Sequence, residues 1–267
     1  MRWSVVIPVF NERDYLSRTL RSLARQQRRF RLIVVDNRSD DGSGELARRL
    51  IEELGLDGEV VFEPNPGAVP ALARGLSRVE TELVATCDAD TYYPRHYLEA
   101  AERLLDARRD AAMASAWYVP PRASRGRAAA AALHQLGAAR LLPRQAHNGA
   151  AGQCFRMEAL RARGGYRLDI WPFVLGDHEI VHRVLKAGRQ VWGRDLWCAP
   201  SDRRRDPDAV RWSLGERLLY HATPFALKDW YFYDFLRPRF ERRGMDSARL
   251  RERDWTELNG VAPYPVC

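Results

Sequence analysis

The stretch that decides the fold is WSVVIPVFNE, residues 3–12, in which an apolar run gives way to Asn11 and Glu12. A short apolar run that is rich in β-branched residues predicts a buried strand, here residues 3–9. Similar runs recur at residues 32–35, 60–62, 83–87 and 111–119, and helical patterns lie between them. This alternation predicts an α/β fold with a mostly parallel, Rossmann-like sheet flanked by helices.

Helix signals separate the predicted strands. Asn11 is positioned to cap a first helix, and Ser43 to cap a second helix that Gly55 ends. Residues 67–76 predict a short helix, and Pro94 is expected to open a further one. The first half of the chain therefore reads as consecutive strand–helix units.

Composition limits the function classes. Lys and Arg number 43 against 35 Asp and Glu, so the net charge is +8 and the pI is about 9.6. Such a charge favours anionic partners: nucleotide diphosphates, nucleic acids or acidic membrane surfaces. The four cysteines form no CxxC pair, which argues against a zinc knuckle or a disulfide framework. No secretion signal and no membrane-spanning apolar stretch is evident, so a cytoplasmic location is expected.

Polar residues that directly follow the predicted strands are the candidates for a site. Ligands of open α/β sheets collect beyond the carboxyl ends of the strands. Three such segments stand out, residues 8–12, residues 36–43 and Asp88-Ala89-Asp90. Two carboxylates separated by one residue can share a divalent cation that bridges a bound diphosphate. The alternative is a solvated turn, but the position of Asp88 and Asp90 after an apolar strand favours the metal.

Together these segments resemble glycosyltransferase family 2, whose members are inverting enzymes of the GT-A fold. The resemblance rests on residues 5–12, 34–43 and 88–90, with Gly67 and Gly75 between them. It implies that Pro8, Phe10 and Glu12 line a nucleotide-sugar pocket and that Asp36 hydrogen-bonds the base. It also implies that Asp88 faces the ribose or the metal and that Asp90 is a metal ligand.

A second part of the resemblance lies downstream, in Gly164-Gly165-Tyr166 and in residues 176–180, GDHEI. The family carries an aspartate here that deprotonates the acceptor, and Asp177 matches it. An inverting displacement needs such a base because an alcohol is a poor nucleophile while it keeps its proton. Asp177 could instead cap the helix that it begins, and the two roles are compatible. His178 adjoins the proposed base and is an acceptor-side candidate.

Other side chains could contact donor or acceptor. Trp171 and Phe173 precede Asp177, and either could stack on a sugar or pack in the core. Arg203 and Arg204, in a basic run, could bond the diphosphate or form a solvated face. Three positions depart from the family pattern: Arg38 stands where Gly is common, Gly176 where an acid is usual, and Ala73 where Asn is frequent.

The resemblance implies transfer of a sugar from a UDP-, GDP- or dTDP-linked donor to a saccharide or lipid-linked acceptor, with Mn²⁺ or Mg²⁺ as cofactor. A nucleotidyltransferase is the nearest alternative, but residues 9–13, VFNER, are not a Gly-rich phosphate loop. A non-catalytic nucleotide-binding or nucleic-acid-binding protein would explain the charge. No nucleic-acid partner is expected, because the arginines are scattered and no binding motif is evident.

The predicted organisation is a catalytic domain, residues 1–205, followed by an Arg- and aromatic-rich extension, residues 206–267. The domain divides into a nucleotide-sugar half (1–119), an Ala- and Arg-rich helical insert (120–145) and an acceptor-side half (146–205). Within the extension, residues 228–240 mix aromatic and basic side chains. That composition suits either burial against the body, which we favour, or a peripheral contact at the inner membrane face.

Overall fold

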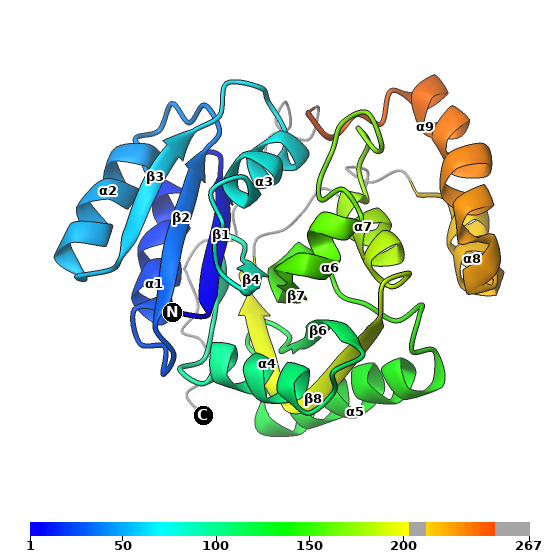
Figure 1. The fold of residues 1–267 in the computed structure, drawn as a ribbon, viewed down its shortest axis with the longest axis horizontal. Helices are drawn as coiled ribbons and strands as arrows, with labels where there is room; N and C mark the ends of the chain where they lie inside the picture. The colour runs from blue at the N-terminus through cyan, green and yellow to red at the C-terminus, as the bar shows by residue number, and fades with distance from the viewer. Residues whose placement is uncertain (203–211, 249–267) are drawn as a thin grey trace.

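The computed structural model describes residues 1–202 and 212–248. Within them, one mixed sheet runs in the order β3-β2-β1-β4-β7-β6-β8-β5 (Figure 1). The strands are β1 (Trp3–Val9), β2 (Phe30–Asp36), β3 (Gly58–Phe62), β4 (Leu83–Thr86), β5 (Thr91–Tyr92), β6 (Ala111–Tyr118), β7 (Gln153–Arg156) and β8 (Arg189–Pro200).

The first half of the sheet is parallel, as predicted. β1 lies between β2 and β4 and is parallel to both, and β3 continues the parallel order. β7 is antiparallel to β4 and β6, while β8 is parallel to β6. The sequence did not predict β8, because its side chains include Trp192, Arg194, Asp195 and Trp197 rather than an apolar run.

Helices cover both faces of the sheet. They are α1 (Arg13–Leu23), α2 (Ser43–Glu53), α3 (Ala68–Leu76), α4 (Tyr97–Asp106), α5 (Arg125–Leu141), α6 (Met157–Ala162), α7 (Gly176–Val184), α8 (Leu214–Ala222) and α9 (Arg237–Arg243). α1, α2 and α4 share one core cluster with Val5 and Ile7, and α3, α6 and α7 share another with Val6. Successive β1 side chains thus pack into the two core clusters on opposite faces of the sheet, which is the alternation expected of a strand buried on both faces.

Gly75 shows how tightly α3 approaches the sheet. A Cβ at Gly75 would lie 2.3 Å from Val6 Cγ1 and 3.0 Å from Val35 Cγ2. Real Cβ atoms do not come this close, so only glycine lets the helix pack directly on β1 and β2.

The predicted cap at Asn11 is wrong. α1 begins at Arg13 with Glu12 as its N-cap residue, and Asn11 has a positive φ of 53°. Asn11 Nδ2 instead donates to Asp40 Oδ1 at 2.8 Å, and the Asp40 N–H donates to Asn11 Oδ1 at 3.0 Å. The Asn11 side chain therefore joins the loops after β1 and β2 and does not cap the start of α1.

Two further helix starts differ from prediction. Ser43 is the first residue of α2, after Gly42, which adopts the left-handed conformation. Pro94 precedes α4, which begins at Tyr97. Gly55 does follow the end of α2 with φ 61°, in agreement with the predicted stop.

Residues 212–248 pack on the body beside α7. α8 and α9 lie beside α7 at the right of Figure 1. Tyr231, Phe232 and Phe240 are fully buried in a cluster with Trp171 and Phe173. The prediction of burial is therefore confirmed for the apolar side chains Tyr231, Phe232, Leu236 and Phe240, whereas Trp230 is 45% exposed. The predicted domain boundary at 205/206 lies outside the described residues, so the division remains a prediction. Among the described residues, no helix combines the length and hydropathy needed to cross a bilayer.

Candidate active site

The register of the parallel strands brings the predicted donor segments to one edge of the sheet. Val9 pairs with Asp36 across β1 and β2, and Val6 pairs with Thr86 across β1 and β4. The residues that follow these strand ends, Phe10 and Asp88, therefore emerge at the same edge as Asp36. Like Pro8 and Glu12, all three are half-buried.

The loops after β1 and β2 are held together by Asp41. Its Oδ2 accepts from the Arg13 N–H at 3.0 Å, and its Oδ1 accepts from the Ser43 N–H at 2.9 Å and the Ser43 hydroxyl at 2.6 Å. Ser43 Oγ in turn accepts from the Glu12 N–H at 2.9 Å. One carboxylate thus satisfies the first backbone N–H groups of both α1 and α2, where helices leave donors unpaired.

We expect Asp41→Ala to lower the free energy of unfolding by ~1–2 kcal/mol at pH 7, the usual effect of removing a helix-capping carboxylate. Burial raises the pKa of Asp41, but the Ser43 hydroxyl and the backbone N–H groups outweigh it, and the net pKa is lowered. A lowered pKa means that this stabilisation is present above the unfolded-state pKa and disappears as the pH falls through the folded-state value. Urea unfolding should therefore show the deficit at pH 7 and a smaller one below about pH 4.

The control for this prediction is Glu52→Ala, which removes an exposed carboxylate near the end of α2. It should stay within about 0.5 kcal/mol of the wild type. Equal losses in the two variants, or an Asp41→Ala deficit that does not change with pH, would contradict the capping role.

Asp36 is oriented by its own loop. Its Oδ1 accepts from the Ser39 N–H at 3.0 Å. A Cβ at Gly44 would lie 2.4 Å from Asp36 Oδ2, so glycine at this position lets the carboxylate lie against the first turn of α2. The next residue, Asn37, is 1% exposed, and its side chain accepts from the Gly67 N–H at 2.9 Å. The end of β2 is thereby fixed to the loop that begins α3.

Asp90 and Asp88 come from the turn after β4. Asp90 is 6% exposed, and its Oδ2 accepts from the Ser201 hydroxyl at 2.7 Å. The Ser201 N–H also donates to the Asp90 carbonyl at 3.0 Å, so the end of β8 holds this turn. The Asp88 N–H donates to Tyr93 Oη at 2.8 Å. Two carboxylates thus enter the edge on a braced segment.

A short turn, η1 (Ala150–Gly152), separates Asp88 from Asp177. Tyr93 Oη, which receives the Asp88 N–H, donates to the Ala151 carbonyl at 3.1 Å. On the other side of the turn, a Cβ at Gly149 would lie 3.1 Å from Asp177 Oδ2. The acids of the donor segments and Asp177 therefore flank one turn at the same edge.

Asp177 itself lies in the first turn of α7, whose N-cap residue is Leu175, and no side chain caps this helix. The capping alternative for Asp177 is therefore wrong. Gln153, fully buried at the start of β7, donates through Nε2 to the Asp177 carbonyl at 3.3 Å and to the Asn148 carbonyl at 3.2 Å. This amide joins α7 to the chain that leads into η1.

Tyr166 is buried, and the charges of Asp177 and Asp88 affect its pKa. Burial raises its pKa well above the ordinary value, and the negative charge of Asp177 raises it further, with a contribution from Asp88. The phenol is therefore neutral, and its hydroxyl lies 3.4 Å from Gln153 Oε1.

His178 packs among aromatic rings beside Asp177. Its ring centroid lies 4.1 Å from that of His147, and the rings of Trp212 and Tyr220 are also in contact. His147 Nε2 lies 2.6 Å from Tyr220 Oη. Burial lowers the pKa of His178 to about 3 and lowers the pKa of His147 well below its ordinary value. Both imidazoles are consequently neutral near pH 7.

The acceptor role predicted for Trp171 is wrong for this structure. The ring is 1% exposed, and its N–H donates to the Val174 carbonyl at 2.8 Å. Phe173, Phe232 and Phe240 surround it with centroid distances of 5.3–6.0 Å. The packing alternative is correct, because aromatic rings from the C-terminal segment cover this indole.

The basic run after β8 is only partly described. Asp202 forms an ion pair with Arg122 at 2.9 Å. Arg203 and Arg204 lie outside the described residues, so their predicted contact with the diphosphate remains a prediction.

Sequence reasoning missed the residues that connect the two halves of the edge, Tyr93, Gly149 and Gln153. Gln153 offered one usable signal, since a polar residue opens the apolar run QCF at 153–155. Tyr93 and Gly149 carried none, because their roles are hydrogen bonds and close contacts between segments that are far apart in the chain.

The donor set suits a hard divalent cation that shares its ligands with a substrate. Residues 1–202 and 212–248 hold no group of three or more His, Cys, Asp or Glu side chains arranged for a metal. Magnesium and similar ions often use one or two carboxylates and take their other ligands from phosphates and water. Asp88 and Asp90 fit this pattern.

Known proteins share this architecture. The family model of Glycosyl transferase family 2 matches residues 4–163, well over half of the chain. A stretch of 109 residues is 34% identical to the undecaprenyl-phosphate 4-deoxy-4-formamido-L-arabinose transferase of Edwardsiella ictaluri, covering 39% of this chain and 33% of that relative. The chain spans about a third of the length of the first curated relatives that it matches.

Solved structures agree on the fold. The mannosyltransferase PcManGT from Pyrobaculum calidifontis, in complex with GDP-Man and Mn²⁺, superposes with a TM-score of 0.67 at 23% identity, covering 93% of this chain and 69% of that one. S. aureus TarS in complex with UDP-GlcNAc gives a TM-score of 0.60 at 17% identity, covering 90% and 73%. These neighbours are GT-A glycosyltransferases. With the matching family model and the strand-end acids at one edge of a GT-A sheet, the chain belongs to glycosyltransferase family 2.

Proposed function

We propose that the protein is an inverting glycosyltransferase that moves a sugar from a nucleotide-diphosphate donor to an acceptor hydroxyl. The observation that supports the proposal is that the Asp88 segment and Asp177 both approach the chain around the η1 turn. Tyr93 Oη accepts from the Asp88 N–H and donates to the Ala151 carbonyl, and Asp177 Oδ2 lies close to Gly149.

On the donor side, Asp36 bonds the base, and Pro8, Phe10 and Glu12 line its pocket. The interlocked loops at Asp41 support this assignment, because they hold the pocket walls before a ligand arrives. A preformed site loses less conformational entropy on binding.

Asp90, with Asp88 beside it, would hold Mn²⁺ or Mg²⁺. A bound cation would neutralise negative charge on the diphosphate as the sugar leaves. The complex of the Pyrobaculum protein with GDP-Man and Mn²⁺ supports a divalent ion in this family. The Ser201 hydroxyl orients the Asp90 carboxylate, and outer partners of this kind are important for metal affinity.

Asp177 accepts the proton of the acceptor hydroxyl. A carboxylate is a weak base in water, but it is effective when it is held against the reacting hydroxyl. The neutral imidazole of His178 lies beside it and shapes the acceptor side.

We propose a saccharide or lipid-linked acceptor and a cytoplasmic protein that meets its acceptor at the membrane surface. The name of the Edwardsiella relative, an undecaprenyl-phosphate transferase, supports a lipid-linked acceptor, and the basic charge of this chain supports attraction to anionic surfaces.

Thermal unfolding with UDP, GDP and dTDP, each with and without MnCl₂, tests the donor side. A ligand at a hundred times its Kd stabilises by ~2.7 kcal/mol, which for a chain of this size raises Tm by roughly 5–10 °C. We expect such a shift for at least one nucleotide, and only with the metal. Equal shifts without metal would contradict the cation, and no shift with any nucleotide would contradict the donor site.

A further inference from the structure

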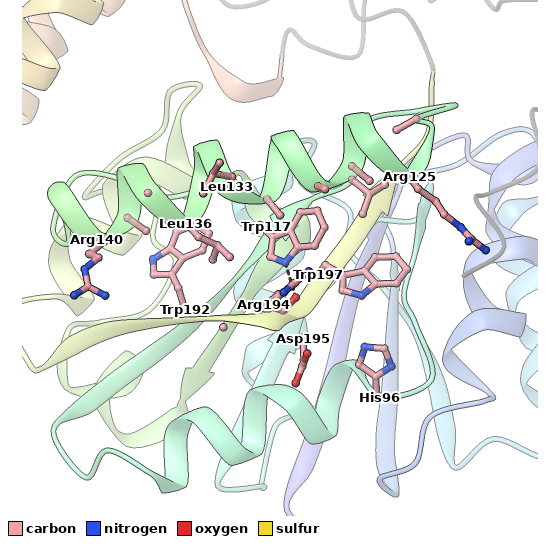
Figure 2. A pocket seen from close by; sticks show the side chains of 18 of the residues that line it. His96, Trp117, Arg125, Leu133, Leu136, Arg140, Trp192, Arg194, Asp195 and Trp197 are labelled. Atoms are coloured by element: carbon pink, nitrogen blue, oxygen red, sulfur yellow. Dashed lines mark hydrogen bonds between the residues drawn. The ribbon is translucent and has the colours of Figure 1, made fainter.

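A groove of 1060 Å³ lies between α5 and the β6–β8 edge of the sheet (Figure 2). Three indoles, Trp117, Trp192 and Trp197, line the strand side. The helix side is lined by small and aliphatic residues, including Ala128, Ala132, Leu133, Leu136 and Gly137. Ligand pockets usually span roughly 300–1,000 Å³ and are mostly apolar. The volume of this groove is just above that range, and the proposed reaction does not use it.

The groove is long enough for an extended chain. Trp192 and Trp197 mark two points along β8, five residues apart, which corresponds to roughly 16 Å of strand. The helix wall between them carries no polar side chain that could read the hydroxyls of a sugar. An acyl chain needs no such partners.

The surroundings of the groove are cationic. Residues 120–145 hold five arginines and no aspartate or glutamate. Among the lining residues, Arg125, Arg140 and Arg194 form no ion pair within the described part of the chain, while Asp195 pairs with Arg103 at 3.1 Å. Figure 2 shows Arg125 and Arg140 toward opposite ends of α5. This charge complements an anionic head group.

One end of the groove carries unpaired polar atoms. Trp192 Nε1 and Gln190 Oε1 are buried and have no hydrogen-bond partner among the described residues. Gln190 is 8% exposed and lines the groove, and its Nε2 donates to the Ala146 carbonyl at 2.8 Å. Buried polar atoms are rarely left unpaired, so a missing partner that supplies an acceptor and a hydroxyl is indicated.

α5 also carries exposed leucines and arginines, some of which lie at the mouth of the groove. Leu133 and Leu141 are 77% and 80% exposed, and Arg127 and Arg140 are exposed on the same helix. Basic side chains without neighbouring acids are attracted to the surface of an anionic bilayer. A lipid of that bilayer is then the molecule nearest to the groove.

We propose that the α5–β8 groove binds the acyl chain of an anionic phospholipid. Arg140 and the Trp192 N–H meet the phosphate, Gln190 Oε1 accepts from a head-group hydroxyl, and the chain runs over Trp117 toward Trp197. The lipid anchors the protein with α5 against the membrane, a contact distinct from the C-terminal aromatic segment, in which Tyr231, Phe232 and Phe240 are buried.

Tryptophan fluorescence of the full chain provides the test, with lysophosphatidylglycerol that carries a brominated acyl chain, below its micelle-forming concentration. Bromine quenches indoles that it contacts. We expect saturable quenching by this lipid, weaker quenching by the brominated monoacylglycerol, and no competition by glycerol phosphate.

Two glycine variants in α5 form the matched pair. A Cβ at Gly137 or at Gly126 would meet nothing within 4 Å, so both positions accept a side chain. Gly137 lines the groove and Gly126 does not. We expect Gly137→Leu to fill the groove and weaken lipid binding at least tenfold, with Gly126→Leu unchanged.

Three outcomes would overturn the proposal. Equal quenching in Gly137→Leu and wild type would exclude the groove. Loss of quenching in Trp230→Phe would move the contact to the C-terminal segment. A concentration-dependent dimer that Gly137→Leu dissociates, in sedimentation without lipid, would assign the groove to a second copy. Nucleotide binding by both glycine variants, measured in parallel, keeps this result separate from the proposed transferase activity.

Discussion

The Asp177→Asn variant is expected to lose roughly 10²–10⁴-fold in kcat while its nucleotide affinity stays within about twofold, because a missing general base affects the chemical step alone. Asparagine keeps the size of the side chain and its contact beside Gly149 but cannot take a proton. Release of nucleoside diphosphate, with a membrane lipid extract as acceptor, measures kcat. Calorimetry with the nucleotide measures binding.

His178→Gln is the control for that variant, since His178 adjoins Asp177 and is the other acceptor-side candidate on α7. Its ring is neutral and packed against His147, so its loss should cost far less than the loss of the aspartate. A His178→Gln defect as large as that of Asp177→Asn, or normal turnover in Asp177→Asn, would assign the proton transfer to another group.

Asp90→Asn is expected to remove the metal-dependent part of nucleotide affinity, a loss of ~100-fold at saturating Mn²⁺, because even outer partners of metal ligands contribute 10–100-fold. The carboxamide keeps an oxygen for the Ser201 hydroxyl but has no charge for the cation. Titration of UDP or GDP by calorimetry, with Mn²⁺ and with EDTA, gives the two affinities.

Ser201→Ala is the graded comparison. It removes the hydroxyl that donates to Asp90 Oδ2 at 2.7 Å but leaves the ligand itself in place. We expect a loss of ~10-fold. An Asp90→Asn protein that still binds nucleotide more tightly with Mn²⁺ than with EDTA would show that the cation is held elsewhere.

The sequence predicted the proposed donor edge because the signal for each strand end lies within a few consecutive residues. An apolar run that ends in polar residues marks both a strand and the point where its side chains leave the sheet, as at Asp36 and Asp88. Parallel order then brings those ends together without further information.

The acceptor side was less predictable because it depends on contacts between distant segments. The local sequence allows Trp171 either to stack on a sugar or to pack in the core. It packs in the core because Phe232 and Phe240, which lie far along the chain, contact its ring. β8 escaped prediction because one side of it faces a groove and carries indoles and charges, which breaks the apolar pattern of a buried strand.

The η1 turn has a consequence for how far the proposed enzyme can reach. Contacts at Gly149 and at Ala151 connect the proposed base and the Asp88 segment to the same short piece of chain. One residue inserted between them, which adds up to about 3.3 Å of chain, would displace one contact relative to the other by more than a bond-forming approach allows. Related chains with a longer turn would have to reposition their base. The length of this turn therefore constrains the distance between the proposed base and the donor segments.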